Sequence, residues 1–285
     1  MMDRSSLRSC LLVLLASAGA SCGSSEAPAS ASGFDVDAAT EAAADAAGTT
    51  DVATGDVDDA TPPTDTGSTP GAPLAPGLYA SKQSFASLLK NPLGGAESPS
   101  ETVSLLLHTL TAEGGKLVSK NQVCEIRQPP SFGVTVVFPR ALIDAMPTTS
   151  SGVTAGAGGA IEFSRDVLVL GASLTTPETE PLPTKRDDPR VIDADKDGQP
   201  GATVKVTGLV SGDIYLVQRN LGGLRGTLGA DGKVTGLLLG TNEQATLGAS
   251  NATLASINLQ PRKNPDPTKS RFVMVSVAAG TSCAK

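Results

Sequence analysis

Apolar and polar positions alternate along the larger part of the chain, from Gly77 onward. The alternation is clearest at Val204 and Val206 and again at Val273 and Val275, and a period of two is the spacing of a strand with one buried face. Stretches rich in Gly, Pro and Asp separate these runs. The pattern therefore predicts an all-β body. The candidate strands are residues 78–86, 102–110, 116–126, 132–138, 160–171, 202–210, 213–220, 223–229, 233–240, 244–250 and 270–277.

The spacing of turn-forming residues predicts how these strands connect. Between Gly208 and Leu247 the segments "SGD", "NLGG", "GADG" and "GTNE" recur every few positions, which is typical of consecutive antiparallel hairpins. About 8–11 strands joined in this way would leave open edges unless the sheet closes on itself. We expect a single antiparallel up-and-down β-barrel over residues 77–285, with a β-sandwich as the alternative. The one helical segment expected is "RALIDAM", residues 140–146.

The start of the first candidate strand, "PGLYAS", carries Gly77 and Tyr79. It resembles the opening of lipocalins, which are eight-stranded up-and-down barrels that hold a small apolar ligand. Lipocalins carry Trp where this chain has Tyr79. The resemblance implies a barrel that can contain a ligand, and it assigns no site residue.

The first 22 residues have the pattern of an export signal. Arg4 and Arg8 precede an apolar run over residues 10–18, and small residues then lead to Cys22, which predicts a secretory signal peptide. The run is shorter than the roughly 20 residues that a bilayer-spanning helix needs.

The end of this signal, "SAGASC", resembles a bacterial lipobox, with Gly19 where leucine is usual. The resemblance implies that residues 1–21 are a lipoprotein signal peptide and that Cys22 is acylated. Because Gly23 follows in place of aspartate, it also implies an outer-membrane lipid anchor. The alternative is ordinary cleavage and a secreted chain.

Composition changes sharply after Cys22. Residues 23–76 carry ten acidic residues and no basic residue, among many Ala, Thr, Pro, Ser and Gly, and this composition predicts a disordered tether over residues 22–76. The tether accounts for the net charge of −7, since the body has 20 basic and 18 acidic residues. A body so close to neutral has no electrostatic footprint for nucleic acid, so we expect no nucleic-acid partner.

The chain contains four cysteines. Cys10 falls in the signal and Cys22 is the expected acylation site, which leaves Cys124 and Cys283. Outside the cytoplasm two such thiols form a stable disulfide, with two separate free thiols as the alternative.

The stretch "VIDADKDGQPGATVKV", residues 191–206, spaces Asp193, Asp195 and Asp197 two apart before a glycine. This spacing fits the first half of an EF-hand calcium loop, although a strand follows where an EF-hand has a helix. The segment resembles the shortened D-x-D-x-D-G loops of dockerin and thrombospondin-type repeats. We expect a structural calcium site formed by the three aspartates and the backbone carbonyl of Gln199. Asp187 or Asp188 is a further candidate ligand, and the alternative is an Asp-rich turn that binds no ion strongly.

The run "DADKDGQPGAT", Asp193 to Thr203, also resembles D-x-D-x-D-G-x-P-G-x-T segments in predicted outer-membrane lipoproteins of Gram-negative bacteria. Those chains have a similar acidic tether and β-rich body, and their function is not established. The resemblance implies a location and an architecture, and it implies no activity.

Catalytic motifs are scarce in this sequence. The single histidine, His108, lies in an alternating strand, and no Gly-x-Ser-x-Gly motif occurs. We expect His108 to face a polar cavity or solvent and the protein not to be an enzyme. The expected function is that of a cell-envelope lipoprotein whose calcium-stabilised barrel binds a small apolar ligand or a partner. The alternative is a structural or surface-display lipoprotein with a packed barrel and no ligand.

Overall fold

The computed structural model describes residues 74–91, 96–256 and 261–283. The predicted signal peptide, Cys22 and all but the last residues of the tether lie outside this part of the chain. The strands are β1 (Gly77–Leu89), β2 (Ser98–Glu113), β3 (Lys116–Arg127), β4 (Val134–Val137), β5 (Thr149–Ala155), β6 (Ala160–Leu170), β7 (Ala202–Gly208), β8 (Gly212–Leu228), β9 (Val234–Ala249), β10 (Pro261–Lys263) and β11 (Arg271–Ser276). The helices are α2 (Arg140–Ala145) and α3 (Ala252–Ser256), with short 3₁₀ turns η1 (Ala157–Gly159) and η2 (Pro267–Lys269).

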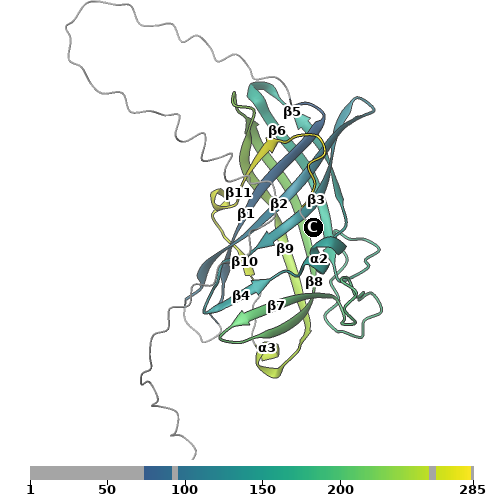
Figure 1. The fold of residues 1–285 in the computed structure, drawn as a ribbon, viewed down its shortest axis with the longest axis vertical. Helices are drawn as coiled ribbons and strands as arrows, with labels where there is room; N and C mark the ends of the chain where they lie inside the picture. The colour runs from purple at the N-terminus through teal and green to yellow at the C-terminus, as the bar shows by residue number, and fades with distance from the viewer. Residues whose placement is uncertain (1–73, 92–95, 257–260, 284–285) are drawn as a thin grey trace, which may run out of the picture. The chain divides into compact units, whose positions relative to one another are not determined.

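All eleven strands belong to one antiparallel sheet, and eight of them close into a ring (Figure 1). The ring runs β1–β2–β3–β5–β6–β8–β9–β11 and returns to β1, so it follows the order of the chain. The predicted all-β fold with a closed antiparallel sheet is confirmed. The single sheet also decides against the sandwich alternative.

Three short strands extend the sheet at one end of the ring. β4 pairs with β3 and with β7, and β7 pairs with β8, so this pair connects the ring strands on either side of β5 and β6. β10 pairs with the last residues of β1. Figure 1 shows β4, β7 and α3 gathered at this end. We call it the β4–β7 end.

The predicted series of short hairpins between Gly208 and Leu247 is right at two of its four turns and wrong at the other two. "SGD" lies at the connection from β7 to β8, and "GADG" lies in the turn between β8 and β9. β8 and β9 are two long strands that pair continuously except for one register shift, and both "NLGG" and "GTNE" lie inside them. Asn220 pairs with Asn242 and Gly222 with Gly240. The glycines mark a close approach instead of a turn, because a Cβ on Gly222 would lie 2.7 Å from the Asp166 carboxylate.

The helix predicted after Pro139 is present as α2, which buries Leu142 and Ile143. In contrast, β5 was not predicted. Its sequence, "TSSGVTA", lacks apolar alternation because its buried Ser151 faces polar side chains in the ring. Within the described part of the chain, no helix has the length and apolar character needed to cross a membrane.

Apolar side chains fill one end of the ring interior. Seven ring strands contribute to this cluster, which we call the packed end. Its buried members are Leu74, Tyr79, Leu110, Val153, Ile161, Phe163, Leu224, Val234, Phe272 and Met274. The Tyr79 hydroxyl donates a hydrogen bond to the Ala75 carbonyl at 2.9 Å. Tyr79, which stands where lipocalins carry Trp, is therefore a core residue in this protein.

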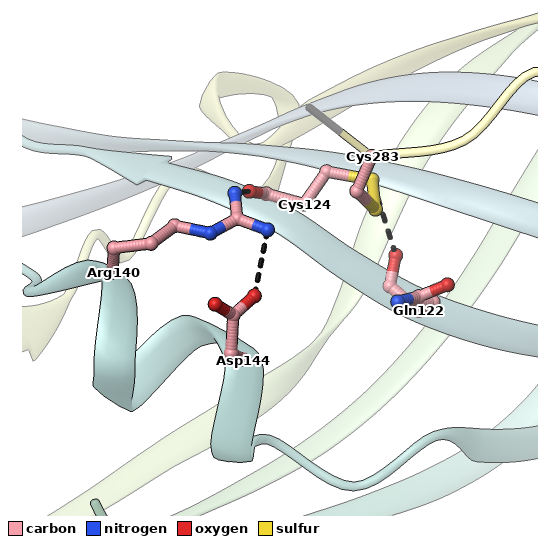
Figure 2. Close-up of a disulfide and its surroundings, with 5 residues drawn as sticks. All are labelled: Gln122, Cys124, Arg140, Asp144 and Cys283. Carbon is pink, nitrogen blue, oxygen red and sulfur yellow. Dashed lines mark hydrogen bonds and ion pairs between the residues drawn. A yellow bond between two sulfur atoms is a disulfide. The ribbon is translucent and has the colours of Figure 1, made fainter. Parts of the chain in front are cut away.

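The C-terminal segment packs against the outside of the ring. Cys124 and Cys283, the two cysteines left for pairing, form a disulfide across a sequence separation of 159 (Figure 2). Around it, Ala80 and Leu107 are buried beneath the segment that leads to Cys283. Arg140 from α2 donates to the Cys124 carbonyl at 3.3 Å, which ties the helix to the same strand.

Candidate functional site

A layer of polar side chains lies next to the packed end inside the ring. His108 on β2 is at its centre. The His108 Nε2 atom lies 2.7 Å from the Ser81 hydroxyl, and Nδ1 lies 2.9 Å from the Asn121 amide oxygen. Burial lowers the pKa of His108 to about 4, so the imidazole group is neutral at pH 7. Because Asn121 presents an acceptor, the ring proton is on Nδ1 and Nε2 accepts from Ser81.

Asn121 joins this histidine to a carboxylate. Its amide nitrogen donates to Ser151 at 3.0 Å and to Oδ2 of Asp166 at 3.1 Å. The Thr149 hydroxyl donates to the same Oδ2 atom at 2.5 Å. The network therefore runs from β1 through β2, β3 and β5 to β6, and it fixes the position of the Asp166 side chain.

A β-bulge explains why Asp166 faces inward. The pairing of β6 with β8 shifts register between Phe163 and Asp166. Phe163 is in the packed end and Asp166 is in the polar layer, so two residues three apart share one face, which regular alternation forbids. Unbroken alternation would turn Arg165 inward in place of Asp166.

The order Ser81, His108, Asn121 is that of a nucleophile, a base and an orienting group. Ser81 is 0 % exposed and does not line the cavity described below, whereas His108 and Asn121 do. Its hydroxyl is therefore covered by neighbouring groups and is not part of the cavity wall. The geometry is that of a buried hydrogen-bond network. Of the two surroundings expected for His108, a polar cavity or solvent, the structure shows the cavity.

Two chambers lie beyond the polar layer, next to a second buried apolar cluster that includes Val204, Leu216 and Leu254. An inner chamber of about 220 Å³ is lined by the polar residues Gln83, Ser104, His108, Asn121, Asp166 and Asn220, together with several apolar ones. An outer chamber of about 670 Å³ follows at the β4–β7 end, and its walls include Leu89, Val136, Val206, Ile214, Leu216 and Leu254. The chambers are adjacent, because Phe138, Gln218 and Gln244 line both.

The predicted metal residues converge in one loop outside the ring. One carboxylate oxygen from each of Asp193, Asp195 and Asp197 lies within 4.8 Å of the others. The Asp193 carboxylate accepts hydrogen bonds from the backbone amides of Asp197 and Gly198 at 3.1 and 2.9 Å. These bonds fold the loop so that the three side chains point together.

Asp195 is the least satisfied of the three. Its Oδ1 atom is buried and has no hydrogen-bond partner among the described residues. Burial raises the pKa of this carboxyl above its ordinary value, and the neighbouring carboxylates of Asp197 and Asp193 raise it further. A hard cation with oxygen ligands would satisfy this atom, so the three aspartates could hold a metal ion.

Two further ligand candidates differ in outcome. The backbone amide of Gln199 donates a hydrogen bond to the Asp197 carboxylate at 2.8 Å. The role of the Gln199 carbonyl oxygen as a metal ligand stays a prediction. Asp188 is not part of the cluster of three carboxylates, and both of its oxygens accept hydrogen bonds from Arg190, at 2.7 and 3.0 Å. Arg190 lowers the pKa of Asp188 to about 2.

No protein-family model, curated protein or solved structure matches this chain. The polar layer is the part of the site that sequence reasoning did not assemble, since only His108 was singled out. A signal was present at Asn121 and Ser119, which have the same parity in β3 and are both buried. Asp166 carried no such signal, because the bulge breaks the alternation at that point.

Proposed function

We propose that this protein is a non-enzymatic cell-envelope lipoprotein that binds a small, largely apolar ligand inside its strand ring. The observation that carries the proposal is the pair of adjacent chambers, of about 220 and 670 Å³. Ligand sites in proteins are usually concave, apolar spaces of roughly 300–1,000 Å³ with a few polar groups that orient the ligand. Apolar surface predominates in both chambers, and Gln83, Asn121 and Asp166 are among the polar groups of the inner one.

A titration with Nile red, an uncharged dye that fluoresces in apolar surroundings, tests this proposal on the exported full chain. We expect a saturable rise in fluorescence. Val210→Trp should weaken binding, because Val210 is half-buried and lines the outer chamber. Ser211→Trp is the matched control, because the adjacent Ser211 is exposed and not part of that wall. If the dye does not bind saturably, the alternative of a structural lipoprotein without a ligand is favoured.

The proposal includes a structural calcium ion held by Asp193, Asp195, Asp197 and the Gln199 carbonyl. Its support is the convergence of three carboxylates and the buried, unpartnered Oδ1 of Asp195. The ion would strengthen this loop. Backbone hydrogen bonds already attach the loop to the end of β6: the Ser173 amide donates to the Arg190 carbonyl at 2.8 Å, and the Ile192 amide donates to the Gly171 carbonyl at 3.0 Å. It has no proposed role in the ligand chambers.

Thermal unfolding in calcium and in chelator tests the metal proposal. A ligand at a hundred times its dissociation constant stabilises a protein by about 2.7 kcal/mol, so a tight site should raise the melting temperature by several degrees. Asp195→Asn should remove this shift, and Asp231→Asn, at an exposed residue in the turn between β8 and β9, should keep it. Equal melting temperatures of the unchanged chain with and without calcium would dismiss the ion.

The lipid anchor rests on the sequence around Cys22, whose resemblance to a lipobox implies acylation and the outer membrane. Incorporation of labelled palmitate by the exported chain tests it. Cys22→Ala should abolish the label and release the chain from the membrane fraction. A labelled Cys22→Ala chain would place the acyl group on another residue, and an unlabelled original chain would favour the secreted alternative.

A further inference from the structure

One charged side chain lines the inner chamber. Among the described residues that form its wall, Asp166 is the only carboxylate, and no Lys or Arg is among them. His108, the other titratable group of the wall, is neutral because burial lowers its pKa to about 4. The ammonium group of Lys263, on β10, donates a hydrogen bond to the Gly240 carbonyl at 2.7 Å, and Lys263 is not one of the lining residues. The inner chamber therefore contains a negative charge without a lining cation.

The two oxygens of Asp166 have different surroundings. Asn121 and Thr149 both donate to Oδ2, and Oδ1 accepts no hydrogen bond from the described residues. Oδ1 lies over β8, where a Cβ on Gly222 would come within 2.7 Å of it. The absence of a side chain at Gly222 therefore leaves room for this oxygen to face the chamber.

A carboxylate held in this way is suited to a cationic donor. Its side chain is already ordered by two hydrogen bonds to Oδ2, so little further entropy is lost when a ligand binds to Oδ1. A charge-assisted hydrogen bond is roughly twice as strong as a neutral one. An anionic head group would instead meet a like charge in an enclosed space, which is unfavourable.

We infer that the ligand is a cationic amphiphile, whose protonated amine lies at Oδ1 of Asp166 and whose apolar body extends past Phe138 into the outer chamber. This inference rests on the proposed function, because it names the chemistry of the ligand that the chambers hold. It places the charged end of the ligand in the inner chamber and the apolar end towards the β4–β7 end of the ring.

Three probes of one chain length test the inference on the exported full chain: dodecylamine, dodecanol and dodecanoate, each below its micelle concentration at pH 7. Isothermal titration calorimetry should show dodecylamine binding roughly tenfold to a hundredfold tighter than the other two, as expected for one charge-assisted hydrogen bond. If dodecanol or dodecanoate binds as tightly as the amine, the head-group inference is wrong while ligand binding stands. If none of the three binds and Nile red does not bind either, both proposals fail.

Asp166→Asn separates binding at this site from adsorption to the acidic tether. The variant keeps a side chain of the same shape, removes the charge, and should bring dodecylamine to the affinity of dodecanol while dodecanol is unchanged. Asp231→Asn, in the exposed turn between β8 and β9, is the matched control and should leave all three affinities unchanged. Amine binding that survives Asp166→Asn would overturn the inference. The ranking of the three probes on the unchanged chain remains a test if the variant does not fold.

Discussion

The two ends of the ring interior are built from the same strands and filled in different ways. At the packed end, β1, β6 and β11 contribute Tyr79, Phe163 and Phe272, which are all buried. Further along, β1 and β2 contribute Gln83 and Ser104, which line a chamber. The polar layer around His108 and Asn121 divides the two. The inner chamber begins where inward residues become polar, and the larger outer chamber keeps apolar walls that include Val206, Ile214 and Leu216. This difference separates a packed core from a candidate binding site.

Removal of the disulfide should have the largest effect on stability. Because the bridge lies outside the ring, its removal should lower stability without changing either end of the interior. In the chain-entropy treatment, a bridge that closes a loop of this length stabilises the fold by about 5 kcal/mol, less any native strain. The double variant Cys124→Ser, Cys283→Ser should lower the free energy of unfolding by up to that amount, as measured by urea denaturation. Nile red binding by the remaining folded protein should be unchanged. If the double variant also loses Nile red binding, the C-terminal segment that leads to Cys283 helps to shape the chambers.

A pair of phenylalanine truncations compares the ends directly. Phe272 is buried in the packed end, where a Cβ on Gly226 would lie only 3.0 Å from its ring. Phe272→Ala should cost about 3–5 kcal/mol of unfolding free energy. Phe138→Ala, at a half-buried residue that lines both chambers, should cost no more than about 2 kcal/mol.

Urea denaturation of the two variants checks these values. Phe138→Ala should alter Nile red affinity, and Phe272→Ala should leave it unchanged in the folded fraction. Equal losses of stability at Phe138 and Phe272 would contradict the contrast between a packed and a hollow end.

The polar layer predicts a specific pH dependence. His108 has a folded pKa of about 4, lowered by burial from an ordinary value of 6.5, so the unfolded chain binds a proton more readily than the folded one. The stability linked to this histidine is therefore complete above pH 6.5 and is lost as pH falls towards 4, by about 3 kcal/mol in all.

His108→Gln isolates this contribution, because the chain has no other histidine. The difference in unfolding free energy between the two chains should change between pH 6.5 and pH 4 and be constant above and below that interval. A constant difference across the whole range would show that His108 titrates as it would in water, and that the layer is open to solvent.

The strands and their closure were accessible from sequence because alternating residues such as Val204 and Val206 have one environment along a whole strand. The long pairing of β8 with β9 was not, because glycine at 222 and 240 has the same local signature in a turn as under a neighbouring side chain. The aspartate loop was located from local spacing alone. Asp166 was not, since its orientation depends on a bulge that forms only when β6 pairs with β8.

The central claim, that the hollow end of the ring holds a ligand, is tested most directly by native mass spectrometry of the exported full chain, compared with its denatured mass. We predict that the native ion carries a small organic molecule that denaturation releases, in addition to any metal ion. Fragmentation of that molecule should give an apolar chain and an amine. A native mass that exceeds the denatured mass by nothing except a metal ion, in protein that also fails to bind Nile red, would contradict the claim.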